Sequence, residues 1–109
     1  MPTTYKVLGQ SNPSATTATT LYTVPSATQA VVSTITVCNQ ASSAATYRIA
    51  VRVAGAALAA AQYIAYDVSL PGNASDTLTL GVTLGATDVI TVYASSATVS
   101  FNAYGSEIS

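Results

Sequence analysis

The sequence predicts an all-β protein: a single antiparallel β-sandwich, of jelly-roll or Ig-like type, with about eight strands and an extended N-terminal arm. Three observations lead to this prediction. Apolar and polar residues alternate with a period of two along most of the chain, which is typical of strands with one buried face. Turn-forming residues interrupt the alternation about every 8–15 residues, as in antiparallel sandwiches. The Ala-rich segment 55–61 is too short to form an independent helix, so we interpret it as a connection with at most one helical turn.

The chain is expected to consist of an N-terminal arm over residues 1–20 and a sandwich domain over residues 21–109. The arm is rich in Ser and Thr and contains the turn-forming pair Asn12-Pro13, so it is too polar to hold a core by itself. We expect it to be partly extended and to gain order on a neighbouring subunit or a larger assembly. Short strands are expected at residues 5–8 and 21–24.

The central strands follow from three alternating segments. In residues 30–38, Val31, Ile35 and Val37 are expected to face inward, with Val32 and Cys38 on the other side. In residues 46–53, the apolar residues are Tyr47, Ile49, Val51 and Val53. In residues 63–70, they are Ile64, Tyr66, Val68 and Leu70. These last two segments are natural antiparallel neighbours, because only the short Ala-rich connection separates them.

The clearest alternation lies in residues 77–84, where Leu78, Leu80, Val82 and Leu84 share one face opposite Thr and Gly. Two further stripes complete the expected sheets: Ile90, Val92 and Ala94, then Val99, Phe101 and Ala103. The predicted core therefore contains large apolar residues from four segments. The residues expected to point inward are Ile49, Val51, Leu78, Leu80, Val82, Ile90, Val92 and Phe101.

The composition argues against an enzyme and against several kinds of binding site. Only 6% of the 109 residues are charged, the net charge is −1, and there is no His and a single Cys. His-based acid–base chemistry and His/Cys zinc sites therefore lack their residues. Nucleic-acid binding lacks the basic surface that neutralises phosphates, and the longest apolar run is shorter than the ~20 residues of a membrane span. We expect no cofactor, no metal and no secretory signal.

Few side chains are candidates for a functional site. The acidic residues Asp67, Asp76 and Asp88 are spaced too widely for a calcium site and are interpreted as turn or structural residues. Cys38, without a His or a second Cys nearby in sequence, is expected to be a small buried residue.

Tyrosine is unusually frequent, with seven copies against one Phe. Because its ring is apolar and its hydroxyl is polar, Tyr is common at interfaces. Tyr47 and Tyr66 lie on the apolar stripes and are expected in or beside the core, whereas Tyr63 and Tyr93 lie on the polar faces. Arg48 and Arg52 either bind an anionic partner or pair with Asp67 on the neighbouring strand. The candidate interface residues are Tyr63, Tyr93, Arg48, Arg52 and Tyr5.

Several short segments of the sequence resemble small structural proteins of tailed bacteriophages, most closely virion proteins of phages that infect cyanobacteria and other aquatic bacteria. These segments are spread along the chain from residue 20 to residue 105: TLYTVP at 20–25, VSTITVCN at 32–39, ATYRIAV at 45–51, LTLG at 78–81, DVITVYAS at 88–95 and VSFNAYG at 99–105. The resemblance implies a virion component made in the host cytoplasm and brings no catalytic residue to this chain.

Composition and resemblance together favour a non-enzymatic protein that decorates or cements a capsid shell. The expected partners are further copies of the chain, with a trimer implied by the resemblance, and the major capsid protein or other virion proteins. A tail, baseplate or fibre-attachment module is the alternative. A glycan-binding module that uses Tyr63, Tyr93 or Tyr104 as stacking platforms is a third hypothesis, from a different class.

Overall fold

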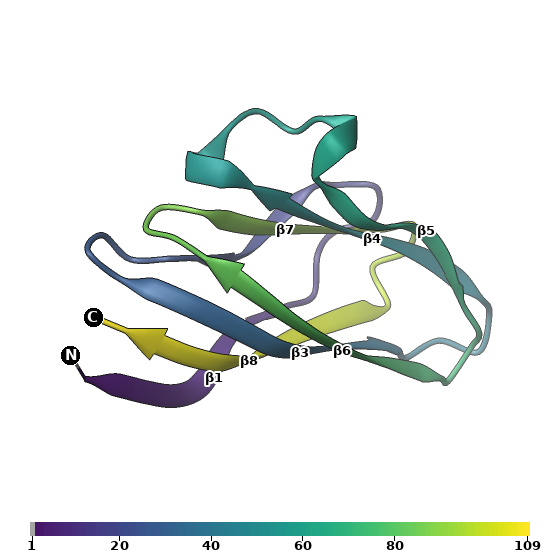
Figure 1. Cartoon of the computed structure of the whole chain (residues 1–109). Helices are drawn as coiled ribbons and strands as arrows, with labels where there is room; N and C mark the ends of the chain where they lie inside the picture. The colour runs from purple at the N-terminus through teal and green to yellow at the C-terminus, as the bar shows by residue number, and fades with distance from the viewer. Residues whose placement is uncertain (1) are drawn as a thin grey trace.

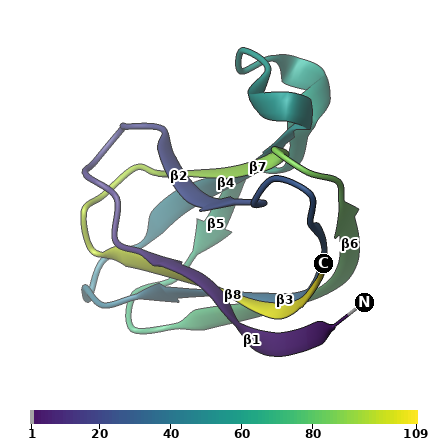
Figure 2. The same ribbon diagram turned by 90° about the vertical axis from the view of Figure 1, so that its left-hand side faces the viewer.

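The computed structural model describes residues 2–109 as two four-stranded antiparallel sheets packed against each other (Figures 1 and 2). One sheet has the strand order β1-β8-β3-β6 and the other β2-β7-β4-β5. The strands are β1 (Thr3–Ser11), β2 (Thr19–Thr23), β3 (Gln29–Asn39), β4 (Ala45–Arg52), β5 (Tyr63–Leu70), β6 (Ser75–Leu84), β7 (Val89–Ala94) and β8 (Val99–Ile108). The predicted all-β fold with about eight strands is confirmed.

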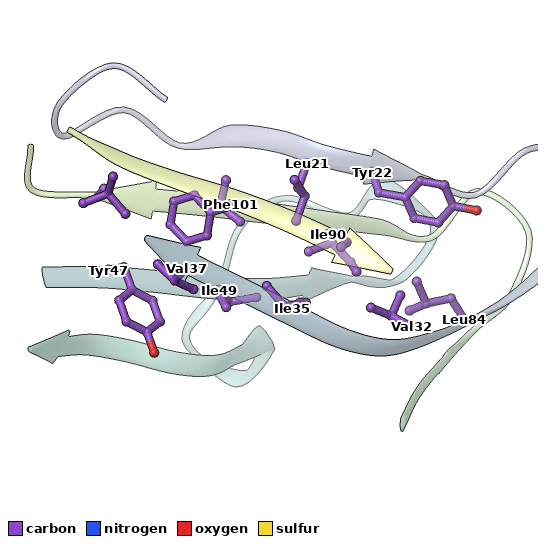
Figure 3. Packing of buried hydrophobic residues seen from close by; sticks show 14 of the residues in the cluster. Leu21, Tyr22, Val32, Ile35, Val37, Tyr47, Ile49, Leu84, Ile90 and Phe101 are labelled. Atoms are coloured by element: carbon purple, nitrogen blue, oxygen red, sulfur yellow. The ribbon is translucent and has the colours of Figure 1, made fainter. Parts of the chain in front are cut away.

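A single hydrophobic core fills the space between the two sheets (Figure 3). Phe101 of β8 packs edge-on against Tyr47 of β4, with ring centroids 6.0 Å apart, so the largest side chains join the two sheets. Of the residues expected inside, Ile49, Ile90, Val92 and Phe101 are fully buried, and Val51, Leu78 and Val82 are half-buried against the core.

The expected inward position of Leu80 is wrong. Val82 pairs with Val32 and Thr79 with Thr34, so Leu80 and Gly81 of β6 together stand opposite the single residue Ser33. This β-bulge, with Gly81 at a φ of +68°, leaves Leu80 39% exposed. A bulge inserts one unpaired residue and interrupts the alternation of faces.

The same region of β3 reverses the expected orientation of two valines. Relative to β8, Ser33 is itself the extra residue, because Val32 pairs with Gly105 and Thr34 with Tyr104. Val32 is therefore fully buried and Val31 only half-buried, the opposite of the expectation. One inserted residue changes the face of every residue on one side of it.

A bulge in β5 likewise moves Tyr66 out of the core. Val68 pairs with Tyr47 and Ala65 with Ile49, so Tyr66 and Asp67 both stand opposite Arg48. Asp67 has a φ of +50°, and Tyr66 is 57% exposed. The expectation that Tyr66 and Ile64 share the inner stripe of Val68 and Leu70 is wrong, because Ile64 is exposed too.

The N-terminal arm expected over residues 1–20 is not confirmed. Residues 3–11 form β1, which pairs along its length with β8, from Thr3 opposite Ile108 to Ser11 opposite Phe101. Within the expected arm, residues 12–18 form the connection from β1 to β2. The Asn12 side chain fixes this connection by donating to the carbonyls of Ala97 and Val99. Met1, part of the expected arm, lies outside the described residues.

The connection between β4 and β5 contains two short 3₁₀ turns, η1 (Val53–Gly55) and η2 (Ala60–Gln62). It stands above the β2-β7-β4-β5 sheet as the teal excursion at the top of Figure 1. The prediction of a connection is confirmed, and the connection contains two 3₁₀ turns where one helical turn was expected.

Candidate interaction surfaces

Arg48 is the centre of a side-chain cluster on the outer face of the β2-β7-β4-β5 sheet. Its Nε donates to the Asp67 carboxylate at 2.6 Å, so the predicted pairing of these two residues is confirmed. The guanidinium also lies over the rings of Tyr66 and Tyr93, 4.2 and 4.3 Å from their centroids. The hydrogen bond from Arg48 holds the pKa of Asp67 below its ordinary value. The bulge in β5 makes this cluster possible, since it places Tyr66 and Asp67 side by side opposite Arg48.

Arg52, the second candidate arginine, holds the connection that follows its own strand. It donates to the carbonyls of Gly55 and Ala56 at 2.9 and 2.7 Å, and to the Thr91 hydroxyl on β7 at 3.4 Å. These bonds tie the η1 turn to the sheet. Arg52 therefore pairs with backbone and not with Asp67.

The other charged residues also have partners within the chain. Glu107 receives hydrogen bonds from Lys6 and from the Tyr22 hydroxyl. Asp76 accepts the Tyr47 hydroxyl at 2.8 Å. Asp88 accepts the backbone N–H groups of Ala54 and Gly85, as expected for a turn residue. The few charges of this chain are thus engaged in holding the fold, which leaves large parts of the surface neutral.

An open hollow of about 590 Å³ lies between β5 and the η2 connection, lined by Tyr63, Tyr66, Leu58, Ala59 and Ala60. The rings of Tyr63 and Tyr66 meet edge-on, with centroids 4.9 Å apart. Tyr63 is a predicted interface residue, whereas Tyr66 is predicted to lie in or beside the core. No local signal in the sequence distinguishes them, because the orientation of Tyr66 depends on the bulge.

The outer face of the β1-β8-β3-β6 sheet is built from neutral side chains. Its cross-strand rows are Tyr5–Ser106–Val31–Thr83, Val7–Tyr104–Thr34–Thr79 and Gln10–Asn102–Thr36–Thr77. None of these residues is charged. Tyr5 is 83% exposed, and with Val7 and Tyr104 it borders a second hollow of about 570 Å³. Tyr5 is one of the predicted interface residues. Tyr104 is predicted only as a glycan-stacking platform, although its alternation with the buried Phe101 and Ala103 places it on the same outer face.

The chemistry of the surface is otherwise limited. Cys38 is exposed on the outer face of β3, so the expectation that it is buried is wrong; its neighbours Val37 and Asn39 point inward instead. Within residues 2–109, no group of three or more His, Cys, Asp or Glu side chains is placed to hold a metal ion. None of the helical segments in this range is long and apolar enough to cross a membrane.

Comparisons of the chain with protein families, with curated proteins and with solved structures find no match.

Proposed function

We propose that the chain is a non-enzymatic structural protein of a tailed-phage virion, and that it decorates or cements the capsid shell as a homo-oligomer. The observation that carries the assembly part of this proposal is the neutral outer face of the β1-β8-β3-β6 sheet. A face of Thr, Ser, Asn, Tyr and Val can pack against another protein without removing ionic groups from water, which is the costly part of burying polar surface.

The exposed aromatic residues support the same proposal. Soluble monomers rarely expose contiguous apolar patches without a functional reason. Here Tyr5, Val7 and Tyr104 are all more than one-third exposed and adjacent in the sheet register. Tyr in such a position contributes a large apolar contact area while its hydroxyl remains near water.

The virion part of the proposal depends on the resemblance of the sequence segments to phage structural proteins. It is tested by measuring the protein composition of purified particles. We expect quantitative mass spectrometry of purified particles of the phage that encodes the chain to find it at a copy number comparable to that of the major capsid protein. A copy number matching the tail proteins would favour the tail, baseplate or fibre-attachment alternative. Absence of the chain from washed particles would exclude both.

Carbohydrate binding is a second candidate function, because the Tyr63–Tyr66 hollow offers ring surfaces beside polar groups. Sugars bind through an apolar face and hydroxyl groups, and aromatic rings suit the apolar face. A glycan array probed with the wild-type chain tests this directly. Binding that is lost in Tyr66→Ala but retained in Tyr104→Ala would support a site in this hollow, and an array without signal would exclude it.

A further inference from the structure

The four edge strands of the sandwich differ in how well they are protected against pairing with another chain. Exposed edges carry unpaired backbone groups, and proteins usually interrupt them with bulges, charges or covering segments. The β6 edge is interrupted by the Leu80–Gly81 bulge, and the β5 edge by the bulge at Tyr66–Asp67. The short β2 edge is covered where Gly9 of β1 abuts the backbone carbonyl of Leu21.

The β1 edge lacks these protections over its first five residues. Residues 3–7 pair with β8 in an unbroken register, and the first irregularity comes between Val7 and Gly9. This segment contains no proline. Its one charged residue, Lys6, is held by Glu107 at 3.0 Å, so that charge is already paired within the chain. Residues 75–79 of the β6 edge also pair in an unbroken register, but their exposed side chains are only Ser and Thr. Residues 3–7 of β1 instead carry the exposed apolar side chains of Tyr5 and Val7.

The side chains of this edge favour a copy of the same strand as the partner. We propose that β1 pairs antiparallel with β1 of a second copy, around a two-fold axis at Tyr5, so that two β1-β8-β3-β6 sheets join into one continuous sheet. In this register Tyr5 stands opposite Tyr5 of the second copy, Thr3 opposite its Val7, and Lys6 opposite its Thr4. Like charges are not placed directly opposite one another, and an aromatic pair stands at the centre.

The neutral outer face of the β1-β8-β3-β6 sheet also allows two copies to pair through β1. In a two-fold interface the same patch meets itself, so a patch with a strong charge of one sign would repel its copy. The rows around Tyr5, Val7 and Tyr104 carry no charge, and pairing brings the two patches into one continuous apolar surface. The inference is independent of the virion role, since it concerns the chain alone.

The pair is expected to dissociate on dilution. Pairing over five residues buries less than the ~800 Å² per partner of a standard stable interface. Light scattering of the full chain should therefore show a mass that rises with concentration from 11.0 kDa toward twice that value. A mass rising toward three times the chain mass, as in the trimer implied by the resemblance, would contradict the two-fold pair.

A cysteine placed at the axis tests the register. In Cys38→Ser/Tyr5→Cys the two introduced thiols would face each other, at the Cα separation of about 4.5–5.5 Å that antiparallel partners have and that a disulfide spans. We expect mild oxidation to give a disulfide-linked dimer. The matched control is Cys38→Ser/Thr79→Cys, which places a thiol at an exposed position of β6, on the opposite edge of the same sheet.

Equal cross-linking of both variants would show random collision and overturn the proposal. A second measurement uses charge: Tyr5→Lys should keep the mass at that of one chain, because it places two positive charges opposite each other. Tyr66→Lys, on the other sheet, should still form the pair. A wild-type chain that remains monomeric at high concentration would refute self-pairing. A Tyr5→Cys thiol that cross-links only to a different protein would also refute it, and would assign the edge to that protein.

Discussion

Two tyrosine–carboxylate hydrogen bonds connect the sheets of this sandwich. Tyr22 of β2 donates to Glu107 of β8, and Tyr47 of β4 donates to Asp76 of β6. Each bond joins a strand of one sheet to a strand of the other. Burial, followed by the hydrogen bond to the carboxylate, raises the pKa of both tyrosines above the ordinary value, so both hydroxyls remain donors.

Glu107 is expected to contribute stability that depends on pH. Hydrogen bonds from Tyr22 and then Lys6 hold its pKa below the ordinary value. A carboxylate whose pKa is depressed in the folded state stabilises the fold above its unfolded pKa, and this contribution is lost as the pH falls through the folded pKa. Glu107→Gln should therefore lower the free energy of unfolding by about 1.5–3 kcal/mol at neutral pH, the range for hydrogen bonds to charged groups.

Urea denaturation at neutral pH, and at a pH below the depressed pKa of Glu107 in the folded state, measures this difference. The wild type and Glu107→Gln should converge at the acidic pH, because Glu107 is then protonated in both folded and unfolded states. Glu107 is 15% exposed, so the effect should resist moderate salt better than that of a surface ion pair. A difference that is the same at both pH values would contradict the assigned cause.

At the scale of single elements, β-bulges decide which residues face the core. The β6 bulge turns Leu80 outward, while Leu84, four residues later on the same strand, is buried. The β5 bulge turns Tyr66 outward and creates the Arg48 cluster. Bulges therefore expose Leu80 and Tyr66 on strands that otherwise alternate regularly.

Leu80 and Leu84 form a matched pair for testing the register of β6. Truncating the buried Leu84 to Ala should cost about 2–5 kcal/mol, as for other large-to-small core changes. Truncating the exposed Leu80 to Ala should cost less than about 0.5 kcal/mol, as for ordinary surface positions. Chemical denaturation of both variants checks the difference. Equal, large losses would place Leu80 in the core and contradict the bulge.

Gly81 is expected to be required because of its backbone conformation and not because a side chain there would clash with neighbouring atoms. Its φ of +68° is unfavourable for residues with a Cβ, and a Cβ built there meets no atom within 4 Å. Gly81→Ala should therefore destabilise the fold by about 1–2 kcal/mol through backbone strain. Gly85→Ala is the control, because a Cβ there makes only ordinary contact with Asp88, at 3.7 Å. Thermal melts that shift equally for both variants would refute the argument.

At the scale of the whole molecule, the first strand completes the sheet that the last strand needs. β8 lies between β1 and β3, so removing β1 would leave one side of β8 without backbone partners. The same removal would take away Leu8, which packs against the core, and the backbone neighbour of Phe101. In Figure 2 the purple N-terminal strand runs beside the yellow C-terminal strand, so the two ends of the chain are neighbours in the same sheet.

Deletion of residues 1–11 is therefore expected to lower the melting temperature strongly or to prevent folding. The loss includes the β1–β8 hydrogen bonds and the apolar contacts of Leu8. Together their contribution is large relative to the small free energy of unfolding of a typical domain. Circular dichroism melts at a concentration where the wild type is monomeric would measure it. A deletion of residues 1–2 alone is the control. An unchanged melting temperature for the longer deletion would show that residues 3–11 are a separable arm after all.

The sequence by itself determined the class of fold and much of the core. Alternation over six to eight residues requires a strand with one buried face, whatever its neighbours are, so Ile49, Ile90 and Phe101 could be placed inside. The short connection between β4 and β5 also allowed the pairing of Arg48 with Asp67 to be predicted, because strands so close in sequence are usually neighbours in space.

Only the tertiary structure decided the positions of the bulges and the role of the first strand. Whether Leu80 or Tyr66 faces inward depends on how many residues the partner strand offers opposite it, and a difference of one residue inverts the face. Similarly, the sequence predicts only a short strand at residues 5–8 within an arm. Residues 3–11 are an integral strand of the sheet because β8, 90 or more residues later, supplies their partners. Pairing between such distant segments leaves no local pattern in a sequence, since the hydrogen bonds involve backbone groups that every residue shares.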